Sequence, residues 1–366
     1  MSLFRAALDG LVPYEPGKPE DELQRELGLD RVVKLASNEG PWGPFPAALE
    51  ALQRSAGVLN RYPDGGAYYL RRALAERHGV DPANVVTAAG ADAIIGHLSV
   101  ATLDPEDEIV TAWPSFISYV LDALKLGASP RTMPLVDDHY DLDALLAAIG
   151  PRTKLVYVAT PNNPTGTMTT RAQLDAYFER VPEHVLTVLD QAYFEYIERP
   201  DYPDGIAEYA KDGRRVLVLR TFSKIYGLAG LRVGYGIGPA DVIEAIGKTR
   251  RAFDVNTQAQ VAALASMDAP DELAERRRLT HEGRDALEHT LREHGLAPTS
   301  PAVANFLFTE VGDDALPLFE ALLRQGVIVR PMGAFGAPGA LRITVGTPDE
   351  NAFFAEALAS VRAATT

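Results

Sequence analysis

The stretch VLVLRTFSKIYGLAGLRVG, residues 216–234, decides how this chain is expected to fold. Its first four residues form a short apolar run, typical of a strand that is buried on both faces of a sheet. Ser223, Lys224 and Arg232 follow that run, around a turn that contains glycine. Open α/β sheets bind ligands beyond the carboxyl ends of their strands. The stretch therefore predicts a strand that leads directly into a ligand site.

Lys224 is the candidate reactive group of that site. A lysine that is partly removed from water has a lowered pKa, so its free amine becomes a nucleophile. The hydroxyl of Ser223 and the guanidinium of Arg232 would suit a phosphate dianion beside it. A lysine taken alone is more often an ordinary solvated side chain. The interpretation therefore depends on what the neighbouring strand ends supply.

Similar apolar runs bounded by turn residues recur before and after this stretch. The runs are 85–89, 109–112, 155–159, 185–189, 216–219 and 233–237. Helical patterns fall between several of them, at 71–77, 91–102, 115–126, 143–149 and 171–180. This alternation predicts an α/β fold with a mainly parallel, doubly wound sheet.

The last hundred residues have a different pattern, which indicates a smaller α+β domain. Helices are expected at 271–294, 315–325 and 348–361, and strands at 305–309, 327–330 and 341–345. We expect an N-terminal arm with part of the small domain over residues 1–44. A large ligand-binding domain would span 45–255, and the small C-terminal domain would span 256–366.

Three more strand ends place polar groups where they could face Lys224. The PNNPTG run at 161–166 would direct the amide of Asn163 to the end of its strand, and Gly90 opens a helix whose N–H groups suit a phosphate. Asp190 ends a very apolar strand, which is costly unless the carboxylate meets a positive partner such as a protonated pyridine nitrogen. A tight turn, a helix cap and a common strand–Gly–helix turn are the ordinary alternatives. The convergence of these polar groups and Lys224 on one ligand favours a binding site over these alternatives.

The composition excludes several classes of protein. The chain has 366 residues, of which 46% are hydrophobic, and a formal charge of −15 that disfavours nucleic-acid binding. It has no cysteine, which excludes disulfides, thiolate metal sites and a cysteine nucleophile. We see no export signal, no membrane span and no GxGxxG, HExxH or GxSxG motif in a suitable place. We therefore expect a cytoplasmic protein without a metal, a nucleic acid or a membrane partner.

Taken together, these segments resemble the fold-type-I aminotransferases, which use pyridoxal 5′-phosphate (PLP), over nearly the whole chain. PNNPTG and the segment SK…LAGLR are typical of that superfamily. Within it, PYEPGKP at 13–19 and LRITVG at 341–346 make the chain most similar to the histidinol-phosphate aminotransferases. The resemblance implies a large PLP-binding domain, a smaller α+β domain and a homodimer.

The resemblance also assigns roles to residues. Lys224 would bind PLP covalently and move a proton between the substrate and the cofactor, Asp190 would keep the pyridine nitrogen protonated, and Tyr193 completes the catalytic set. The phosphate would be held by Ser223, Arg232 and the helix start. Phe116 would stack on the ring, where related enzymes often have Tyr. The expected cofactor contacts are Ala91, Asp92, Phe116, Asn163, Asp190, Tyr193, Ser223, Lys224, Arg232 and, from the partner subunit, Tyr62.

The expected substrate contacts are Tyr14, Asn38, Asn163, Arg330 and Arg342. Arg342 would bind the carboxylate of glutamate and, with Arg330 and Tyr14, the phosphate of histidinol phosphate. A guanidinium fits both anions. Structural ion pairing is the alternative, above all for Arg330. One departure from the resembling enzymes is Gln191, which stands where they commonly have Glu.

The function implied is transamination of L-histidinol phosphate, an amino donor, with the 2-oxo acid 2-oxoglutarate, in histidine biosynthesis. An aromatic amino-acid aminotransferase on the same scaffold is the first alternative. A PLP-dependent decarboxylase and a non-catalytic PLP-fold binding protein are two more, although the presence of Lys224, Asp190 and Asn163 speaks against the last.

Overall fold

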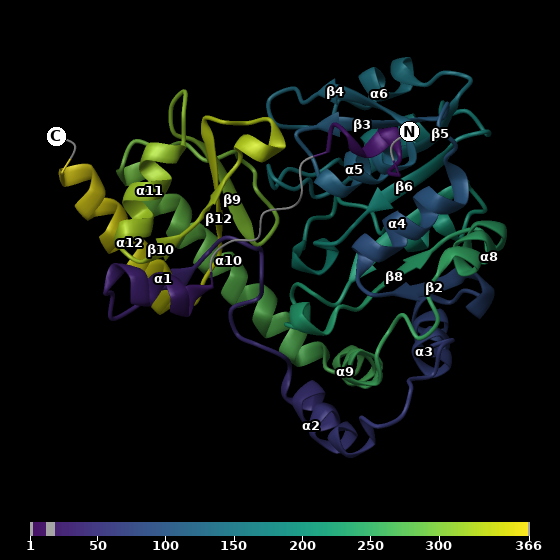
Figure 1. Ribbon diagram of the computed structural model, residues 1–366, viewed down its shortest axis with the longest axis horizontal. Helices are drawn as coiled ribbons and strands as arrows, with labels where there is room; N and C mark the ends of the chain where they lie inside the picture. The colour runs from purple at the N-terminus through teal and green to yellow at the C-terminus, as the bar shows by residue number, and fades with distance from the viewer. Residues whose placement is uncertain (1–2, 12–18, 365–366) are drawn as a thin grey trace.

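The computed structural model describes residues 3–11 and 19–364 of the chain. Figure 1 shows two lobes, a larger one built on a wide sheet and a smaller one that contains the C-terminal elements. The long helix α10 (Pro270–Glu293) runs between them and packs against helix α12 (Pro348–Ala363) in the smaller lobe. No helix of the described residues is long and apolar enough to cross a membrane.

A seven-stranded sheet forms the centre of the larger lobe, in the order β2-β8-β7-β6-β5-β3-β4. Its strands are β2 (Val85–Ala88), β3 (Glu108–Trp113), β4 (Ser129–Pro134), β5 (Thr153–Ala159), β6 (Leu186–Asp190), β7 (Val216–Thr221) and β8 (Gly234–Ile237). All neighbours are parallel except β8, which is antiparallel to both β2 and β7. The predicted mainly parallel α/β sheet is confirmed.

Strand β4 is the one member of this sheet that the sequence did not predict. Its residues, SPRTMP, are largely exposed and include two prolines. Proline cannot donate to a sheet ladder, so it is confined to edges, and β4 pairs with β3 alone. An edge strand of this kind lacks the apolar run by which the other six strands were recognised.

Helices share one large hydrophobic core with the sheet. They are α2 (Pro46–Ser55), α3 (Tyr68–His78), α4 (Ala91–Thr102), α5 (Ile117–Leu126), α6 (Leu142–Ala148), α7 (Arg171–Phe178), α8 (Ala240–Thr249) and α9 (Thr257–Met267). Two of them, α2 and α9, pack mainly against each other. This core includes Ala259, Ala262 and Met267 of α9, and thus extends past residue 255. The division into domains at that residue stays a prediction.

The smaller lobe has its own core and a three-stranded antiparallel sheet, in the order β11-β12-β9. The strands are β9 (Phe306–Glu310), β11 (Arg330–Pro331) and β12 (Ala340–Thr344), with helices α10, α11 (Leu316–Arg324) and α12 around them. Strand β1 (Val33–Lys34) pairs in parallel with β10 (Val327–Ile328). Helix α1 (Glu20–Leu27) precedes that strand. The residues that follow β1 are thereby led from the smaller lobe towards the carboxyl ends of the larger sheet.

Candidate active site

A pocket of about 270 Å³ lies at the carboxyl ends of the parallel strands and is closed by residues of the smaller lobe. The expected site residues that line it are Asn38, Ala91, Asp92, Phe116, Asn163, Asp190, Tyr193, Ser223, Lys224, Arg232, Arg330 and Arg342. Tyr62 does not line it, and Tyr14 lies outside the described residues. Parallel strands end at one edge of a sheet, which is why residues so far apart in sequence meet here.

Lys224 lies in the turn after β7, within this pocket. Burial, together with the positive charges of Arg342 and Arg232, lowers the pKa of its amine to about 8. A larger fraction of the amine is therefore uncharged near neutral pH than in a solvated lysine. The backbone at Gly40 passes close to the turn that contains Lys224. A Cβ on Gly40 would lie only 2.8 Å from the carbonyl oxygen of Lys224.

Asp190 is the last residue of β6 and is 7% exposed. Burial raises the pKa of its carboxyl, and hydrogen bonds from the Tyr119 hydroxyl and the Ala192 amide oppose that rise. The hydroxyl donates to Oδ2 at 2.6 Å and the amide to Oδ1 at 3.0 Å. A buried carboxylate held in this way is suited to a cationic partner in the pocket.

Tyr119 is a site residue that reasoning from the sequence missed. Its ring is buried and stacks on Tyr157, with the ring centroids 4.3 Å apart, and its edge packs against Phe116. The available signal was its spacing, because a residue three positions after Phe116 at the start of α5 shares a helix face with it.

Tyr193 and Asn38 join the two lobes across the pocket. The Asn38 side chain donates to the Tyr193 hydroxyl at 2.9 Å, and the backbone N–H of Asn38 donates to the Thr344 hydroxyl at 3.0 Å. Asn305 in turn donates to the carbonyl oxygen of Asn38. Burial raises the pKa of Tyr193 to about 12, so its hydroxyl stays protonated and can donate to a ligand.

A cradle for an anion lies where β2 leads into α4. Gly90 has φ +92° and ψ 163°, a conformation that only glycine adopts readily, and a Cβ there would lie 2.6 Å from the Arg232 guanidinium. Arg232 also donates to the Ser223 hydroxyl at 3.4 Å. The helix start and the guanidinium together present positive charge to the pocket.

Two arginines lie side by side on the smaller lobe. Arg330 of β11 is paired in register with Arg342 of β12, and both line the pocket. Arg342 donates to the side chain of Asn163 and, at 2.7 Å, to the carbonyl oxygen of Ala36. The Arg330 guanidinium lies 5.9 Å from the centre of the Phe335 ring. The pair can bind an anionic group on the side of the pocket that the smaller lobe forms.

Tyr62 is 81% exposed and stacks on Phe253, with their ring centroids 4.5 Å apart. It lies apart from the pocket of its own chain, so a role in catalysis requires a second subunit. That role stays a prediction.

The chain is similar to known proteins along nearly its whole length. Residues 30–358 match the family model "Aminotransferase class I and II". The chain is 44% identical over 360 residues to a histidinol-phosphate aminotransferase of Moorella thermoacetica, covering 98% of this chain and 93% of that protein. It is also 44% identical to histidinol-phosphate aminotransferase 2 of Pseudomonas fluorescens, covering 99% and 98%.

Solved structures agree with these relatives. The histidinol-phosphate aminotransferase of Sinorhizobium meliloti in complex with pyridoxal 5′-phosphate superimposes with a TM-score of 0.90 at 29% identity, covering 100% of this chain and 99% of that one. An aspartate aminotransferase of Thermus thermophilus shares the fold, with a TM-score of 0.84 at 24% identity, covering 99% and 100%. The resemblance deduced from the sequence motifs is confirmed, and the chain belongs to the class I and II aminotransferases.

Proposed function

We propose that this chain is a PLP-dependent aminotransferase that transfers the amino group of L-histidinol phosphate to 2-oxoglutarate. The observation on which this depends is one pocket that is lined by an anion cradle from the larger lobe and by two adjacent arginines from the smaller lobe. The same pocket contains Lys224, with its lowered pKa, and the buried carboxylate of Asp190. The names of the relatives and the PLP bound to one of them support the same reading.

The residues present fit PLP. The α4 start, Ser223 and Arg232 would hold its phosphate, and Asp190 would face the cationic ring nitrogen. Phe116, which also lines the pocket, would cover the ring. When bound, PLP supplies an electron-withdrawing ring that stabilises negative charge on the substrate carbon. Lys224 would bind the cofactor covalently through its amine.

Each catalytic side chain has a defined task with a proton. The Lys224 amine would take the proton from the substrate carbon, and its pKa of about 8 suits an acid–base group that acts near neutral pH. Asp190 keeps the proton on the ring nitrogen. The Tyr193 hydroxyl, held by Asn38, donates to the ring oxygen together with the Asn163 amide.

The substrate side of the pocket suits an amino donor with a second anionic group. Arg342 is held by Asn163 and the Ala36 carbonyl, so its position is defined before substrate arrives. Arg330 lies in register beside it, and within residues 3–11 and 19–364 no ion pair of Arg330 is found. This favours a ligand role for Arg330 over structural pairing. Phosphate in one half-reaction and carboxylate in the other would use the same guanidinium groups.

A screen of amino donors tests the proposal. The purified holoenzyme is mixed with histidinol phosphate, histidinol, phenylalanine or tyrosine, and conversion of PLP to the pyridoxamine form is followed by absorbance. Histidinol phosphate should react with the highest kcat/KM. Arg330→Met should lower that value by about tenfold to a hundredfold and affect phenylalanine little, because a charge-assisted hydrogen bond to phosphate contributes about 1.5–3 kcal/mol. Arg324→Met, on the exposed face of α11, is the control.

Three other outcomes would contradict the proposal. A protein that transaminates phenylalanine or tyrosine and ignores histidinol phosphate is the aromatic aminotransferase. Release of CO2 from the donor indicates the decarboxylase. Normal transamination by Lys224→Ala would exclude the mechanism itself.

We further propose a homodimer in which Tyr62 of the partner subunit contacts the cofactor phosphate. The exposure of Tyr62 and its stacking on Phe253 support this arrangement, since an exposed aromatic pair is suited to contact a second chain. The cytoplasmic location expected from the sequence stays a prediction.

A further inference from the structure

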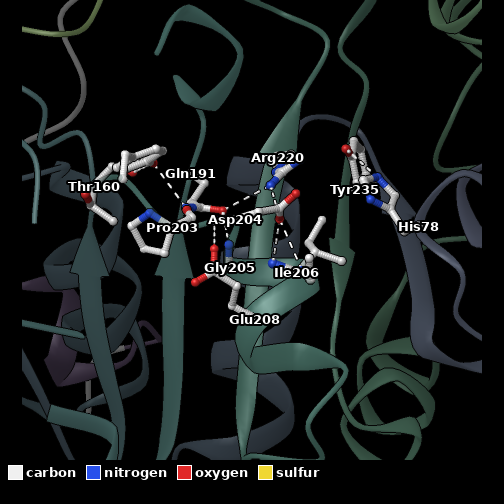
Figure 2. A network of polar contacts seen from close by, with 12 residues as sticks. His78, Thr160, Gln191, Pro203, Asp204, Gly205, Ile206, Glu208, Arg220 and Tyr235 are labelled. Atoms are coloured by element: carbon white, nitrogen blue, oxygen red, sulfur yellow. Dashed lines mark hydrogen bonds and ion pairs between the residues drawn. The ribbon is translucent and has the colours of Figure 1, made fainter. Parts of the chain in front are cut away.

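Gln191 is fully buried directly after Asp190, and every hydrogen-bonding position of its side chain is used. Its Nε2 donates to the Tyr202 hydroxyl at 3.1 Å and to the Pro203 carbonyl at 2.9 Å. Its Oε1 accepts from the Gly205 amide at 3.1 Å and from Arg220 at 3.2 Å. Figure 2 shows the amide at the centre of this network, between the strands that end at the pocket.

This one amide joins the segments that lead into the site. The Tyr202 hydroxyl, bonded to Gln191, donates to the carbonyl oxygen of Thr160, which precedes the PNNPTG loop and Asn163. Arg220, also bonded to Gln191, lies on β7 shortly before Lys224. Gln191 itself directly follows Asp190, the last residue of β6. The three strand ends that present an amide, a carboxylate and an amine to the pocket therefore share one buried anchor.

The anchor is specific for a neutral amide. The Tyr202 hydroxyl hydrogen is already directed at Thr160, and the Pro203 carbonyl is an acceptor, so both groups need an N–H from Gln191. A glutamate in this place would direct a carboxylate oxygen at two acceptors. Arg220 already has a counter-ion, because it pairs with Asp204 at 2.6 Å. A second negative charge would also be buried beside Asp190, which disfavours two ionised carboxylates.

The loop that contains Gly205 approaches the side-chain amide of Gln191 closely. A Cβ on Gly205 would lie 2.5 Å from the Leu189 side chain and 2.9 Å from Oε1 of Gln191. Only glycine allows the amide of residue 205 to approach the anchor so closely. The Arg220 guanidinium is covered on its other face by Phe194, whose ring centre lies 3.4 Å away. The surroundings of Gln191 thus leave no room for rearrangement around a carboxylate.

We propose that Gln191 is a positioning residue that holds the ends of β5, β6 and β7 in register, so that Asn163, Asp190 and Lys224 meet PLP in one geometry. It touches neither cofactor nor substrate and acts through these neighbours. The proposal rests on the PLP-dependent function proposed above. It also means that glutamate, the common residue in the resembling enzymes, is a harmful substitution in this chain.

Two variants and one matched control test it. Gln191→Glu keeps the shape of the side chain and changes only its donors and charge. Tyr202→Phe deletes the hydroxyl that links Gln191 to Thr160. Tyr177→Phe is the control, because it deletes a buried hydroxyl that bonds Thr187 at 3.0 Å outside the network. For each protein, PLP is titrated into the apo-protein to measure its affinity. The pH midpoint of the bound-PLP absorbance is recorded, and kcat, KM and Tm are measured.

Gln191→Glu should weaken PLP binding and lower kcat by about tenfold or more with little change in KM, because a displacement of about 1 Å can cost about a hundredfold. Its added negative charge should raise the pH midpoint of the absorbance band. Tyr202→Phe should weaken PLP binding in the same direction, by less. Tyr177→Phe should lower Tm and leave the midpoint and the PLP affinity unchanged.

The inference is overturned if Gln191→Glu and Tyr202→Phe lower Tm as Tyr177→Phe does and leave the midpoint, PLP affinity and kcat at wild-type values. If Gln191→Glu does not fold, Tyr202→Phe decides alone by the same measurements. A wild-type protein with no PLP absorbance band would overturn the proposed function instead, so the two failures are distinguishable.

Discussion

The hydroxyl of Tyr119 donates a 2.6 Å hydrogen bond to the carboxylate of Asp190, inside a stack of two buried tyrosine rings. A hydrogen bond to the charged form of a carboxyl lowers its pKa, and here it opposes the rise that burial causes. Tyr119 therefore helps Asp190 to stay ionised before a cationic ring nitrogen arrives.

Tyr119→Phe should make PLP binding more sensitive to acid. Without the hydroxyl, Asp190 takes up a proton at a higher pH, because the hydrogen bond from Tyr119 lowers the pKa of this carboxyl. When PLP is titrated into the apo-protein at a series of pH values, its affinity should thus begin to fall at a higher pH than in the wild type. Tyr157→Phe removes the hydroxyl of the stacked ring, which does not bond Asp190, and should keep the wild-type pH profile. Identical profiles for both variants would contradict the prediction.

Lys224 predicts an unusual dependence of stability on pH. Its pKa is about 8 in the folded protein and ordinarily 10.5, so between these values the unfolded chain binds more protons than the folded one. Stability of the apo-protein should therefore rise with pH through this window. Lys224→Met should be more stable than the wild type at pH 7 by about 3 kcal/mol, and this advantage should shrink as the pH rises from 8 towards 10.5.

Urea denaturation of the two apo-proteins at pH 7, 8, 9 and 10 measures that difference. Lys248→Met, at an exposed ion pair on α8, serves as the control and should show no such trend. An advantage of Lys224→Met that stays constant with pH would come from packing alone and would contradict the titration of Lys224.

Gly90→Ala should damage the anion cradle as well as the backbone. The conformation of Gly90, with positive φ and extended ψ, costs an alanine about 1–3 kcal/mol, and the new Cβ displaces the Arg232 guanidinium. Gly28→Ala imposes a left-handed alanine at the end of α1, where a Cβ meets nothing within 4 Å. Both variants should lose thermal stability, but only Gly90→Ala should lose affinity for PLP and for inorganic phosphate. Equal phosphate affinity in both would show that Arg232 does not form the cradle.

Mixing two defective subunits tests the interface role of Tyr62. Lys224→Ala and Tyr62→Ala should each have little activity as homodimers. After unfolding and refolding together, half of the dimers are mixed, and each mixed dimer contains one complete site. About a quarter of the wild-type rate should return. No recovery in a sample whose mixed dimers are verified by mass spectrometry would place Tyr62 outside the partner's site.

Reasoning from the sequence identified the elements whose signal is local. Six of the seven large-sheet strands have short apolar runs between turn residues, and the polar residues at their ends, such as Asp190 and Asn163, follow those runs directly. The order of the strands brings these ends together, so the pocket lining could be predicted in large part. The edge strand β4 could not, because an exposed strand with two prolines has no apolar signature.

The contacts that cross between elements were beyond the sequence. The hydrogen bond of Tyr119 to Asp190 depends on how far α5 lies from β6. The hydrogen bond of Asn38 to Tyr193 depends on how the smaller lobe is placed against the larger one. Gln191 was noted only as an unusual residue. Its four partners come from loops and from β7, whose meeting depends on tertiary packing and leaves no periodic pattern.

The hydrogen bond between Asn38 and Thr344 joins residues that are 306 positions apart, at opposite ends of the chain. During synthesis the N-terminal part of a chain emerges and folds first. The large sheet can form while the strand with Thr344 and Arg342 is still unmade, but Asn38 then has no support beneath Tyr193. A growing chain is therefore a folded lobe without a finished pocket. The substrate side of the pocket can be completed only after Arg342 and Thr344 of β12 have been synthesised.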